Sequence, residues 1–344
     1  MKDGLLQRLE RGPVVCAEGY LFELERRGYV QAGAFVPEVV LDHPDVVAQL
    51  HRDFVHAGSD VVEAFTYYAH REKMRIVGKE HLLEALNRQA LALAKKVASE
   101  TGALFAGDVC NTNVYAEDEA SRNAVRAMFG EQVAWAAEAG VDYVIAETFS
   151  HVGEALLALK VIKEAGLPAV VTLIPHRAPH TRDGVSFGEA ARRLEAAGAD
   201  VVGLNCGRGP RTMLPLLAEI REAVSIPVAG LPVPYRTTPE EPTFQSLRDP
   251  DYPNPPGGRS FPTALDPFTC TRYEVADFAR AAWELGVSYL GLCCGAGPHH
   301  VRSLAEALGR TPPGSRYSPD MSKHAYFGTD ERLRPENVEF AEQL

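Results

Sequence analysis

Short apolar runs and longer amphipathic stretches alternate along the 344-residue chain. Stretches such as "HPDVVAQLHRDFVHA" and "SFGEAARRLEAA" place apolar residues at helical spacing. The short runs between them are nearly continuous in hydrophobicity, which is typical of parallel strands covered by helices. The pattern predicts an α/β protein built on a parallel sheet.

A glycine marks the passage from helix to strand at four places. The segments "HAGSDVVEAF", "EAGVDYVIAE", "AAGADVVGLN" and "ELGVSYLGLC" carry it at Gly58, Gly140, Gly198 and Gly286. Glycine adopts the left-handed conformation that ends many helices, so each segment predicts a helix end, a short turn and a strand. The recurring pattern is half of a βαβ unit.

Eight strands are expected from the apolar runs. They cover Val14–Glu18, Val61–Tyr68, Ala103–Val109, Asp142–Phe149, Ala169–Ile174, Asp200–Cys206, Val228–Val233 and Ser288–Cys294. Eight strands alternating with helices predict a (β/α)8 TIM barrel, with a six- or seven-stranded doubly wound sheet as the alternative. No GxGxxG follows the first run, which disfavours a dinucleotide-binding sheet.

The expected organisation is a catalytic barrel over residues 1–310 followed by a tail over 311–344. Within the barrel, residues 234–270 lose all periodicity and are rich in Pro, Gly, Asp and Thr. A loop of this length is a candidate lid over the site, although a surface insertion without a role in chemistry is the alternative. The tail is polar and irregular up to a short helical pattern, and we expect it to pack outside the barrel or on a partner.

Composition narrows the class of protein. Hydrophobic residues make up 46% and charged residues 24%, the mix of a soluble globular protein. The net charge of −11 argues against a nucleic-acid or anionic-membrane partner. The N-terminus "MKDGLLQRLERGPVV" has no apolar signal segment, and no run of roughly eighteen uncharged apolar residues occurs. A cytoplasmic protein with reduced cysteines is expected, because six cysteines are too few for a disulfide scaffold.

Three cysteines stand at predicted strand ends. "GLNCGRGP" holds Cys206 and "GLCCGAGP" holds Cys293 and Cys294. The C-terminal ends of barrel strands meet on one face, so three thiols would converge there. Three sulfur ligands and one free position match a catalytic zinc site. The alternative is that these cysteines are small buried residues, but two copies of one motif are hard to explain by packing.

Other metal-ligand types carry less weight. Cys16, Cys110 and Cys270 are expected to be ordinary buried residues, since free cysteine is among the most buried types. His299 and His300 follow Pro298 at a predicted helix start. They are expected to cap that helix or to lie on the surface rather than bind metal.

Several ordered motifs resemble the homocysteine S-methyltransferases that carry a Cys…CysCys zinc set, and among them most resemble the betaine–homocysteine S-methyltransferases. The likeness runs through "GLLQRLERGPVV", "LERRGYVQAGAFVPEVVLDHPDVVAQLHRDFVHAGSDVVEAFTYYA", "VDYVIAETFSHVGEAL", "GLNCGRGP", "LGLCCGAGPHHVRSLAEAL" and "SPDMSKHAYFG". It covers most of the chain.

The resemblance implies a zinc-dependent transfer of a methyl group from a betaine-like quaternary ammonium donor to homocysteine. Zinc would keep the acceptor sulfur as a thiolate, which is the nucleophilic form. Zinc would lie on Cys206, Cys293 and Cys294, and Glu147 would hold the amino group of homocysteine. For Glu147 the alternative is a structural ion pair.

The same resemblance implies further contacts. The turn "EAFTYY" would offer backbone N–H groups to the homocysteine carboxylate, with Thr66 nearby. Tyr68 would lie close to the metal and donor, or would be strand-end packing instead. Glu18 and Gly19 stand where the family has an Asp-Gly-Gly turn, with one residue fewer.

Two departures concern the methyl donor. Phe35 stands where the betaine enzymes have tryptophan, and Thr148 where they have tyrosine. Each change weakens cation–π binding by about 1 kcal/mol. With Tyr67 and Tyr235, the rings of Phe35 and Tyr68 would remain to hold an onium group.

Other functions stay open at this point. A sulfonium donor such as S-methylmethionine is the alternative within the class. A non-catalytic zinc or thiol sensor, and a transferase that works with a corrinoid carrier protein, are alternatives outside it. A homo-oligomer is expected, and the long C-terminal arm of the vertebrate enzymes is missing beyond Leu344.

Overall fold

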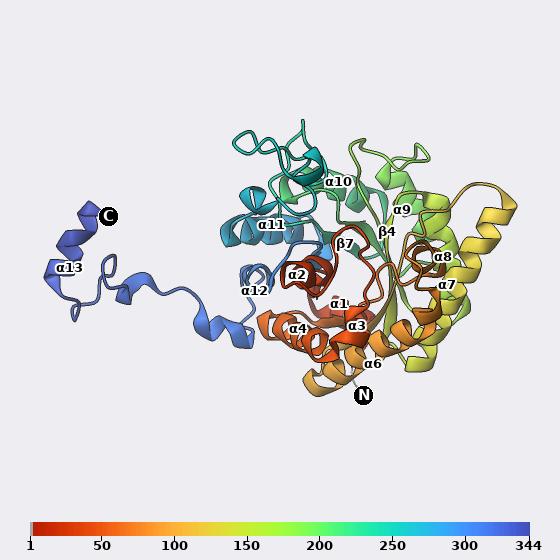
Figure 1. Cartoon of the computed structure of the whole chain (residues 1–344), viewed down its shortest axis with the longest axis horizontal. Helices are drawn as coiled ribbons and strands as arrows, with labels where there is room; N and C mark the ends of the chain where they lie inside the picture. Colours follow the sequence, from red (N-terminus) through yellow and green to blue (C-terminus); the bar gives the residue numbers. More distant parts are fainter. Residues whose placement is uncertain (1–2) are drawn as a thin grey trace.

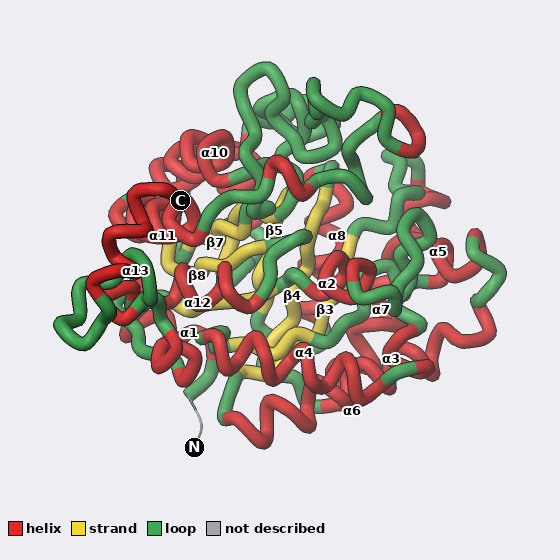
Figure 2. Tube along the Cα trace, turned by 60° about the vertical axis from the view of Figure 1, so that its left-hand side comes forward, coloured by secondary structure: helices red, strands yellow, loops and turns green. Residues whose placement is uncertain are grey.

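The computed structural model describes residues 3–344 and contains one parallel sheet of eight strands. The strands are β1 (Val14–Ala17), β2 (Val61–Glu63), β3 (Leu104–Cys110), β4 (Tyr143–Phe149), β5 (Ala169–Leu173), β6 (Val201–Asn205), β7 (Val228–Leu231) and β8 (Val287–Leu292). Their order is β1-β8-β7-β6-β5-β4-β3-β2. Figures 1 and 2 show the strands enclosed by helices, which confirms the predicted (β/α)8 barrel.

The barrel closes between β1 and β2 through one aspartate. Asp60 precedes β2, and its N–H donates to the Val15 carbonyl at 2.8 Å, while its carboxylate accepts from the Val15 N–H at 2.7 Å. Arg310 pairs with the same carboxylate and donates to the Pro13 carbonyl. The seam is therefore held by a side chain where the strand ladder is interrupted.

Helices cover the outside of the sheet, apart from the last one, which lies in the C-terminal tail. They are α1 (Leu5–Arg11), α2 (Tyr20–Arg26), α3 (Val39–Asp42), α4 (Pro44–Ala57), α5 (Arg71–Ile76), α6 (Leu83–Thr101), α7 (Glu119–Ala139), α8 (Val152–Glu164), α9 (Phe187–Ala196), α10 (Pro210–Ala223), α11 (Arg272–Glu284), α12 (Pro298–Ala307) and α13 (Pro335–Phe340). Gly58, Gly140, Gly198 and Gly286 all have positive φ, which confirms the predicted helix ends. No helix within residues 3–344 is long and apolar enough to span a membrane.

The second strand is shorter than predicted. The apolar run was expected to form a strand over Val61–Tyr68, but β2 ends at Glu63. The hydroxyl of Thr66 donates to the Asp108 carbonyl at 2.8 Å, and the N–H of Thr66 turns back to Ala64. These local bonds replace the strand ladder, so the chain curls over the end of the barrel.

Side chains fill the barrel interior below that end. Tyr143 and Tyr289 lie fully buried there, with their hydroxyl groups 2.9 Å apart. Smaller residues such as Cys16 and Ala106 pack in the same interior cluster. The space open to small molecules therefore lies only above this layer, at the C-terminal ends of the strands.

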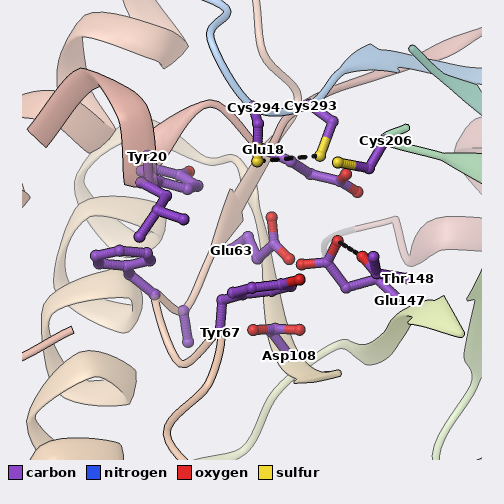
Figure 3. A pocket seen from close by; sticks show the side chains of 13 residues that line it. Glu18, Tyr20, Glu63, Tyr67, Asp108, Glu147, Thr148, Cys206, Cys293 and Cys294 are labelled. Carbon is purple, nitrogen blue, oxygen red and sulfur yellow. Dashed lines mark hydrogen bonds between the residues drawn. The ribbon is translucent and has the colours of Figure 1, made fainter. Parts of the chain in front are cut away.

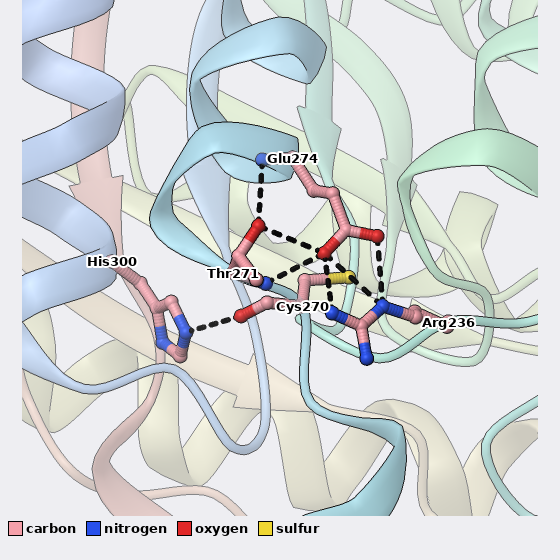
Figure 4. Close-up of polar contacts among 5 residues, drawn as sticks. All are labelled: Arg236, Cys270, Thr271, Glu274 and His300. Atoms are coloured by element: carbon pink, nitrogen blue, oxygen red, sulfur yellow. Dashed lines mark hydrogen bonds and ion pairs between the residues drawn. The ribbon is translucent and has the colours of Figure 1, made fainter. Parts of the chain in front are cut away.

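Residues 234–270 form the long loop between β7 and β8, teal in Figure 1. The beginning of this segment is tied to the start of α11 (Figure 4). Arg236 pairs with Glu274 at 2.7 Å, and Thr271 and Glu274 form a capping box. Hydrogen bonds from Arg236 lower the pKa of Glu274 to about 2.

After α12, the short 3-10 helix Pro313–Tyr317 still packs against α4, and the tail beyond it runs away from the barrel, blue in Figure 1. It carries α13 and several large apolar side chains that are at least a third exposed. These side chains belong to Tyr317, Met321, Tyr326, Phe327, Val338, Phe340 and Leu344.

Candidate active site

Three sulfur atoms meet at the C-terminal end of the barrel (Figure 3). Cys206 directly follows β6, and Cys293 and Cys294 directly follow β8. The three Sγ atoms lie within 4.8 Å of one another, and those of Cys293 and Cys294 are 3.8 Å apart. All six cysteines are free thiols. The structure thus brings together the trio expected from the two sequence motifs.

The intervening strand β7 positions both cysteine segments. The N–H of Cys206 donates to the Leu231 carbonyl at 2.9 Å, and the N–H of Cys293 donates to the Pro232 carbonyl at 2.9 Å. Gly295 follows with φ +94, and a Cβ there would lie 2.2 Å from the Tyr235 hydroxyl. Backbone bonds and a close approach at glycine therefore hold the sulfurs on one side of the site.

The trio has the chemistry of a metal site. The pKa of Cys206 is lowered because Cys293 and Cys294 hydrogen-bond to its sulfur. Burial raises the pKa of Cys293, and the hydrogen bond with Cys206 raises that of Cys294. A thiophilic divalent cation would stabilise all three as thiolates, so the donor set fits such an ion.

A narrow cavity adjoins the sulfurs. Four acidic side chains line it, and no Lys, Arg or His of residues 3–344 does. Its lining residues are Glu18, Tyr20, Leu21, Glu63, Ala64, Phe65, Tyr67, Asp108, Glu147, Thr148, Cys206, Cys293 and Cys294. We call this space the acidic cavity.

A hydrogen-bond network holds Glu147 at the wall of the acidic cavity. Its carboxylate accepts from the Thr148 hydroxyl at 2.7 Å and from the Asn205 amide. The Asn205 carbonyl oxygen accepts from the Thr148 N–H and from the Thr172 hydroxyl, each at 2.9 Å. Burial raises the pKa of Glu147 to about 7. No cationic side chain pairs with it, which excludes the structural ion pair within residues 3–344.

Glu63 and Asp108 were not anticipated from the sequence. Both Glu63 oxygens and one Asp108 oxygen are buried without a hydrogen-bond partner among residues 3–344, as is one oxygen of Glu18. Burial raises the pKa of all three carboxyls well above the usual range. Figure 3 shows Glu63 and Asp108 facing the same space as Glu147. Unpartnered buried carboxyls indicate a place for a cationic ligand group.

A second, larger cavity of about 300 Å³ shares Cys206 and Cys294 with the first. No Asp or Glu of residues 3–344 lines it. Its lining residues are Leu21, Phe22, Gly33, Phe35, Tyr67, Tyr68, Lys73, Asn111, Asn113, Thr148, Ser150, Ile174, His176, Cys206, Phe244, Gln245, Phe261 and Cys294. We call this space the aromatic cavity. The loop 234–270 contributes Phe244, Gln245 and Phe261.

Backbone strain concentrates at the aromatic cavity. Within residues 3–344, five non-glycine residues have positive φ, and all five line this space. They are Phe35, Tyr68, Asn113, Thr148 and Cys206. Such conformations are uncommon for residues with a side chain and cluster where a site imposes them. The clustering marks the two adjoining cavities as the functional site.

The remaining expected site residues lie behind the cavity walls. Gly19 begins α2 and touches the backbone next to the cysteines, because a Cβ there would lie 2.2 Å from the Ala296 carbonyl oxygen. Thr66 is buried with its hydroxyl on the Asp108 carbonyl. Tyr235 is fully buried, accepts from Arg26 at 2.9 Å and lines neither cavity. The structure thus brings Glu18, Phe35, Tyr67, Tyr68, Glu147 and Thr148 to the cavities, but not these three.

The two histidines after Pro298 lie away from the sulfurs. His300 accepts from the Gly297 N–H at 3.3 Å and reaches the Cys270 carbonyl at 3.1 Å (Figure 4), so the expected capping role is confirmed. The alternative of a surface position is wrong for His300, which is buried because it bridges α12 to the chain before α11.

Comparisons with known proteins show the family of this chain. The model of the family described as Homocysteine S-methyltransferase matches residues 16–308. The chain is 38% identical over 342 residues to a betaine–homocysteine S-methyltransferase of Xenopus tropicalis, covering 95% of this chain and 80% of the relative. It is 38% identical over 334 residues to an S-methylmethionine–homocysteine S-methyltransferase of Pongo abelii, covering 95% and 87%.

A solved structure shares the fold. The metallated form of the homocysteine methyltransferase MmuM from Escherichia coli superposes with a TM-score of 0.67 at 18% identity, covering 87% of this chain and 97% of that one. The family model and the two relatives define the chain as a methyltransferase. More particularly, the chain belongs to the homocysteine S-methyltransferase family.

Proposed function

We propose that this enzyme transfers a methyl group from an onium donor to homocysteine, giving methionine, with zinc on Cys206, Cys293 and Cys294. One observation carries the proposal. The three thiols lie where a cavity lined by four carboxyls adjoins a cavity lined by aromatic rings. An amino-acid acceptor suits the first cavity and a methylated cation suits the second.

The acceptor sulfur needs to lose its proton before it attacks carbon. Zinc, when bound, supplies a Lewis acid that keeps the acceptor sulfur as a thiolate at neutral pH. Cys206, Cys293 and Cys294 would hold it, and the fourth position is left for the substrate. The cysteine segments are fixed by β7, which supports a rigid placement of the acceptor sulfur.

The acidic cavity supports binding of the amino-acid end of homocysteine. Glu147 would accept a hydrogen bond from the ammonium group, with Glu63 and Asp108 facing the same space. Within residues 3–344, the N–H groups of Phe65 and Tyr67 make no hydrogen bond in the protein, whereas those of Ala64, Thr66 and Tyr68 do. The two free N–H groups are the ones that would bind the acceptor carboxylate.

The aromatic cavity supports binding of the donor. The faces of Tyr68 and Phe35 would stabilise the positive charge of the onium group. In the transfer, the acceptor sulfur forms a bond to the methyl carbon while the bond from that carbon to nitrogen or sulfur breaks. The bonding pair leaves with the neutral amine or sulfide, so the donor charge disappears as the thiolate charge is used.

Metal content and methionine formation test the proposal together. We expect about one zinc per chain in the wild type, and loss of both zinc and activity in C206A, C293A and C294A. Cys270→Ala is the matched control, because Cys270 is equally buried but lies outside both cavities. Full zinc content after loss of any of the three thiols would contradict the assignment.

The donor assay separates the remaining alternatives. Homocysteine is supplied with glycine betaine, dimethylsulfoniopropionate or S-methylmethionine, each alone, and methionine is measured. Activity with any of them supports the proposed function. A zinc-loaded protein that forms no methionine with any of these donors would instead be the non-catalytic thiol barrel.

A further inference from the structure

Lys73 is the cationic side chain of the aromatic cavity. Its ammonium nitrogen lies 4.6 Å from the centroid of the Tyr68 ring. The other basic residue of that lining among residues 3–344 is His176, and burial lowers its pKa. The cavity therefore contains one ammonium group and no carboxylate from residues 3–344.

The neighbours of Lys73 on α5 show what is unusual about it. Arg71 pairs with Glu80 and Glu131, each at 2.6 Å, and Arg75 pairs with Glu72 at 2.7 Å. Lys73 forms no ion pair within residues 3–344. The helix thus neutralises its two outward cations and leaves the inward one without a carboxylate.

The start of α5 directs Lys73 toward the cavity. His70 caps the helix, and its Nδ1 accepts from the Lys73 N–H at 3.3 Å. Asn111 and Asn113 line the same cavity and offer neutral amide donors. The surroundings of Lys73 therefore suit an anionic group of a bound molecule.

An unpaired lysine on the Tyr68 ring has a second consequence. An onium group near that ring would face a like charge, which lowers the affinity for a donor that is only a cation. A donor that also carries a carboxylate would pair with Lys73 and remove this repulsion. A donor with a further ammonium group, such as S-methylmethionine, would find no carboxylate here to pair with that group, because the four carboxyls of the site line the acidic cavity instead.

We propose, on the basis of the proposed function, that Lys73 binds the carboxylate of the methyl donor and that the donor is an onium carboxylic acid without a second ammonium group. Lys73 is then a specificity-determining residue. Its place in the cavity, its contact with Tyr68 and its missing ion pair carry the inference.

The test compares donors with and without a carboxylate in the wild type and three variants. Wild type, Lys73→Met and Lys73→Arg are assayed with glycine betaine, dimethylsulfoniopropionate, S-methylmethionine and trimethylsulfonium. Arg75→Met is the matched control, since Arg75 is on the same helix with a side chain that is 61% exposed. We expect K73M to lower kcat/KM by about ten- to one-hundred-fold for the two onium acids. We expect trimethylsulfonium to be used as well as before or better, and K73R to recover most of the loss.

Two results would overturn the inference. One is an equal loss for trimethylsulfonium and the onium acids in K73M, which is what a structural role predicts. The other is a wild type that uses S-methylmethionine more efficiently than either onium acid. A failure of the proposed function is distinct, because the wild type would then form no methionine at all. In that case, calorimetric titration with dimethylglycine still tests whether Lys73 binds the carboxylate. We expect dimethylglycine to bind the wild type and to bind K73M at least tenfold more weakly.

Discussion

Asn205 organises the acceptor side of the site, and its substitution by aspartate should impair acceptor use. The Asn205 amide donates to Glu147, to the Thr148 hydroxyl at 3.0 Å and to Glu18 at 3.3 Å. Its carbonyl oxygen accepts from the Thr148 N–H and the Thr172 hydroxyl. Aspartate keeps the shape and these two accepting contacts but loses every donated bond.

The size of the effect follows from the contact to Glu147. A hydrogen bond to a charged group contributes about 1.5–3 kcal/mol. Its loss, with a fifth carboxyl added to a cavity that already has four, predicts a fall of about ten- to one-hundred-fold in kcat/KM for homocysteine. The zinc content should stay near one per chain, because the Asn205 amide contacts the thiol trio through one long bond, to Cys293 Sγ at 3.9 Å, and the Cys206 N–H bonds to Leu231.

The assay varies homocysteine at saturating donor and measures zinc in the same samples. Thr172→Val is the control, since it removes one neutral hydrogen bond to Asn205 and leaves Glu147 untouched. We expect it to cost about 1 kcal/mol of stability and to leave kcat/KM unchanged. An N205D protein with full zinc and unchanged kcat/KM would refute the reasoning that Asn205 orients Glu147. Loss of zinc in N205D would refute the idea that Asn205 orients Glu147 without contributing to zinc binding.

Three further predictions concern other parts of the chain. Glu63→Gln should raise KM for homocysteine at constant zinc content, and an unchanged KM would mean that Glu63 does not face the ammonium group; steady-state kinetics decide. His51 is buried, and its ring has no hydrogen-bond partner among residues 3–344. Burial lowers its pKa in the folded chain to about 3, whereas its pKa in the unfolded chain is about 6.5. As the pH falls below about 6.5, the unfolded chain therefore takes up the proton before the folded chain does. Wild type should therefore lose about 2 kcal/mol more stability than His51→Leu between pH 7 and pH 5 in urea unfolding, and equal losses would contradict the depressed pKa. We propose that the tail holds copies of this chain together. Removal of residues 318–344 should therefore convert an oligomer to a monomer in light scattering and leave the zinc content unchanged. If the truncated chain still forms an assembly with the wild-type number of copies, the barrel associates without the tail.

The barrel and the thiol trio could be predicted from the sequence because each depends on a local pattern. Gly58, Gly140, Gly198 and Gly286 end helices where the chain requires positive φ, and the strands follow them directly. The two cysteine motifs lie at strand ends, and the fold brings such ends together whatever the loops do. Features that recur at the same place in successive βα units can therefore be predicted from the sequence alone.

Glu63 and Asp108 were missed although the signal was present. Inward side chains alternate along a strand, so Val61 and Ala106 in the barrel interior put Glu63 and Asp108 on the same face. Glu147 follows Ile145 in the same way. Applying this period to all strand ends would have found the acidic cavity, whereas a search for known motifs did not.

Lys73 and Tyr235 could not be placed from the sequence. Lys73 reaches the cavity because a turn after β2 starts α5 at one particular angle, and no local pattern encodes that angle. Tyr235 was expected to face the donor, but Arg26 and the close approach of Gly295 hold it behind the wall. The position of Tyr235 depends on contacts with segments more than 40 residues away in the sequence, and the position of Lys73 depends on the geometry of a single turn.

The two cavities differ in what builds them, and this difference bears on how the enzyme family changes substrate. Strand ends supply the acidic cavity: Glu63 and Glu147 belong to β2 and β4, and Asp108 to β3. Loops and one short helix supply most of the aromatic cavity, including Phe35, Lys73 and the segment 234–270. Strands of a closed barrel tolerate little change, while loops vary more readily. The acceptor side should therefore be the constant part of the site and the donor side the variable one, as the names of the relatives above suggest by sharing homocysteine and differing in the donor. Substitution of Phe35 and Lys73 by other residues should then alter which donor is used without changing KM for homocysteine.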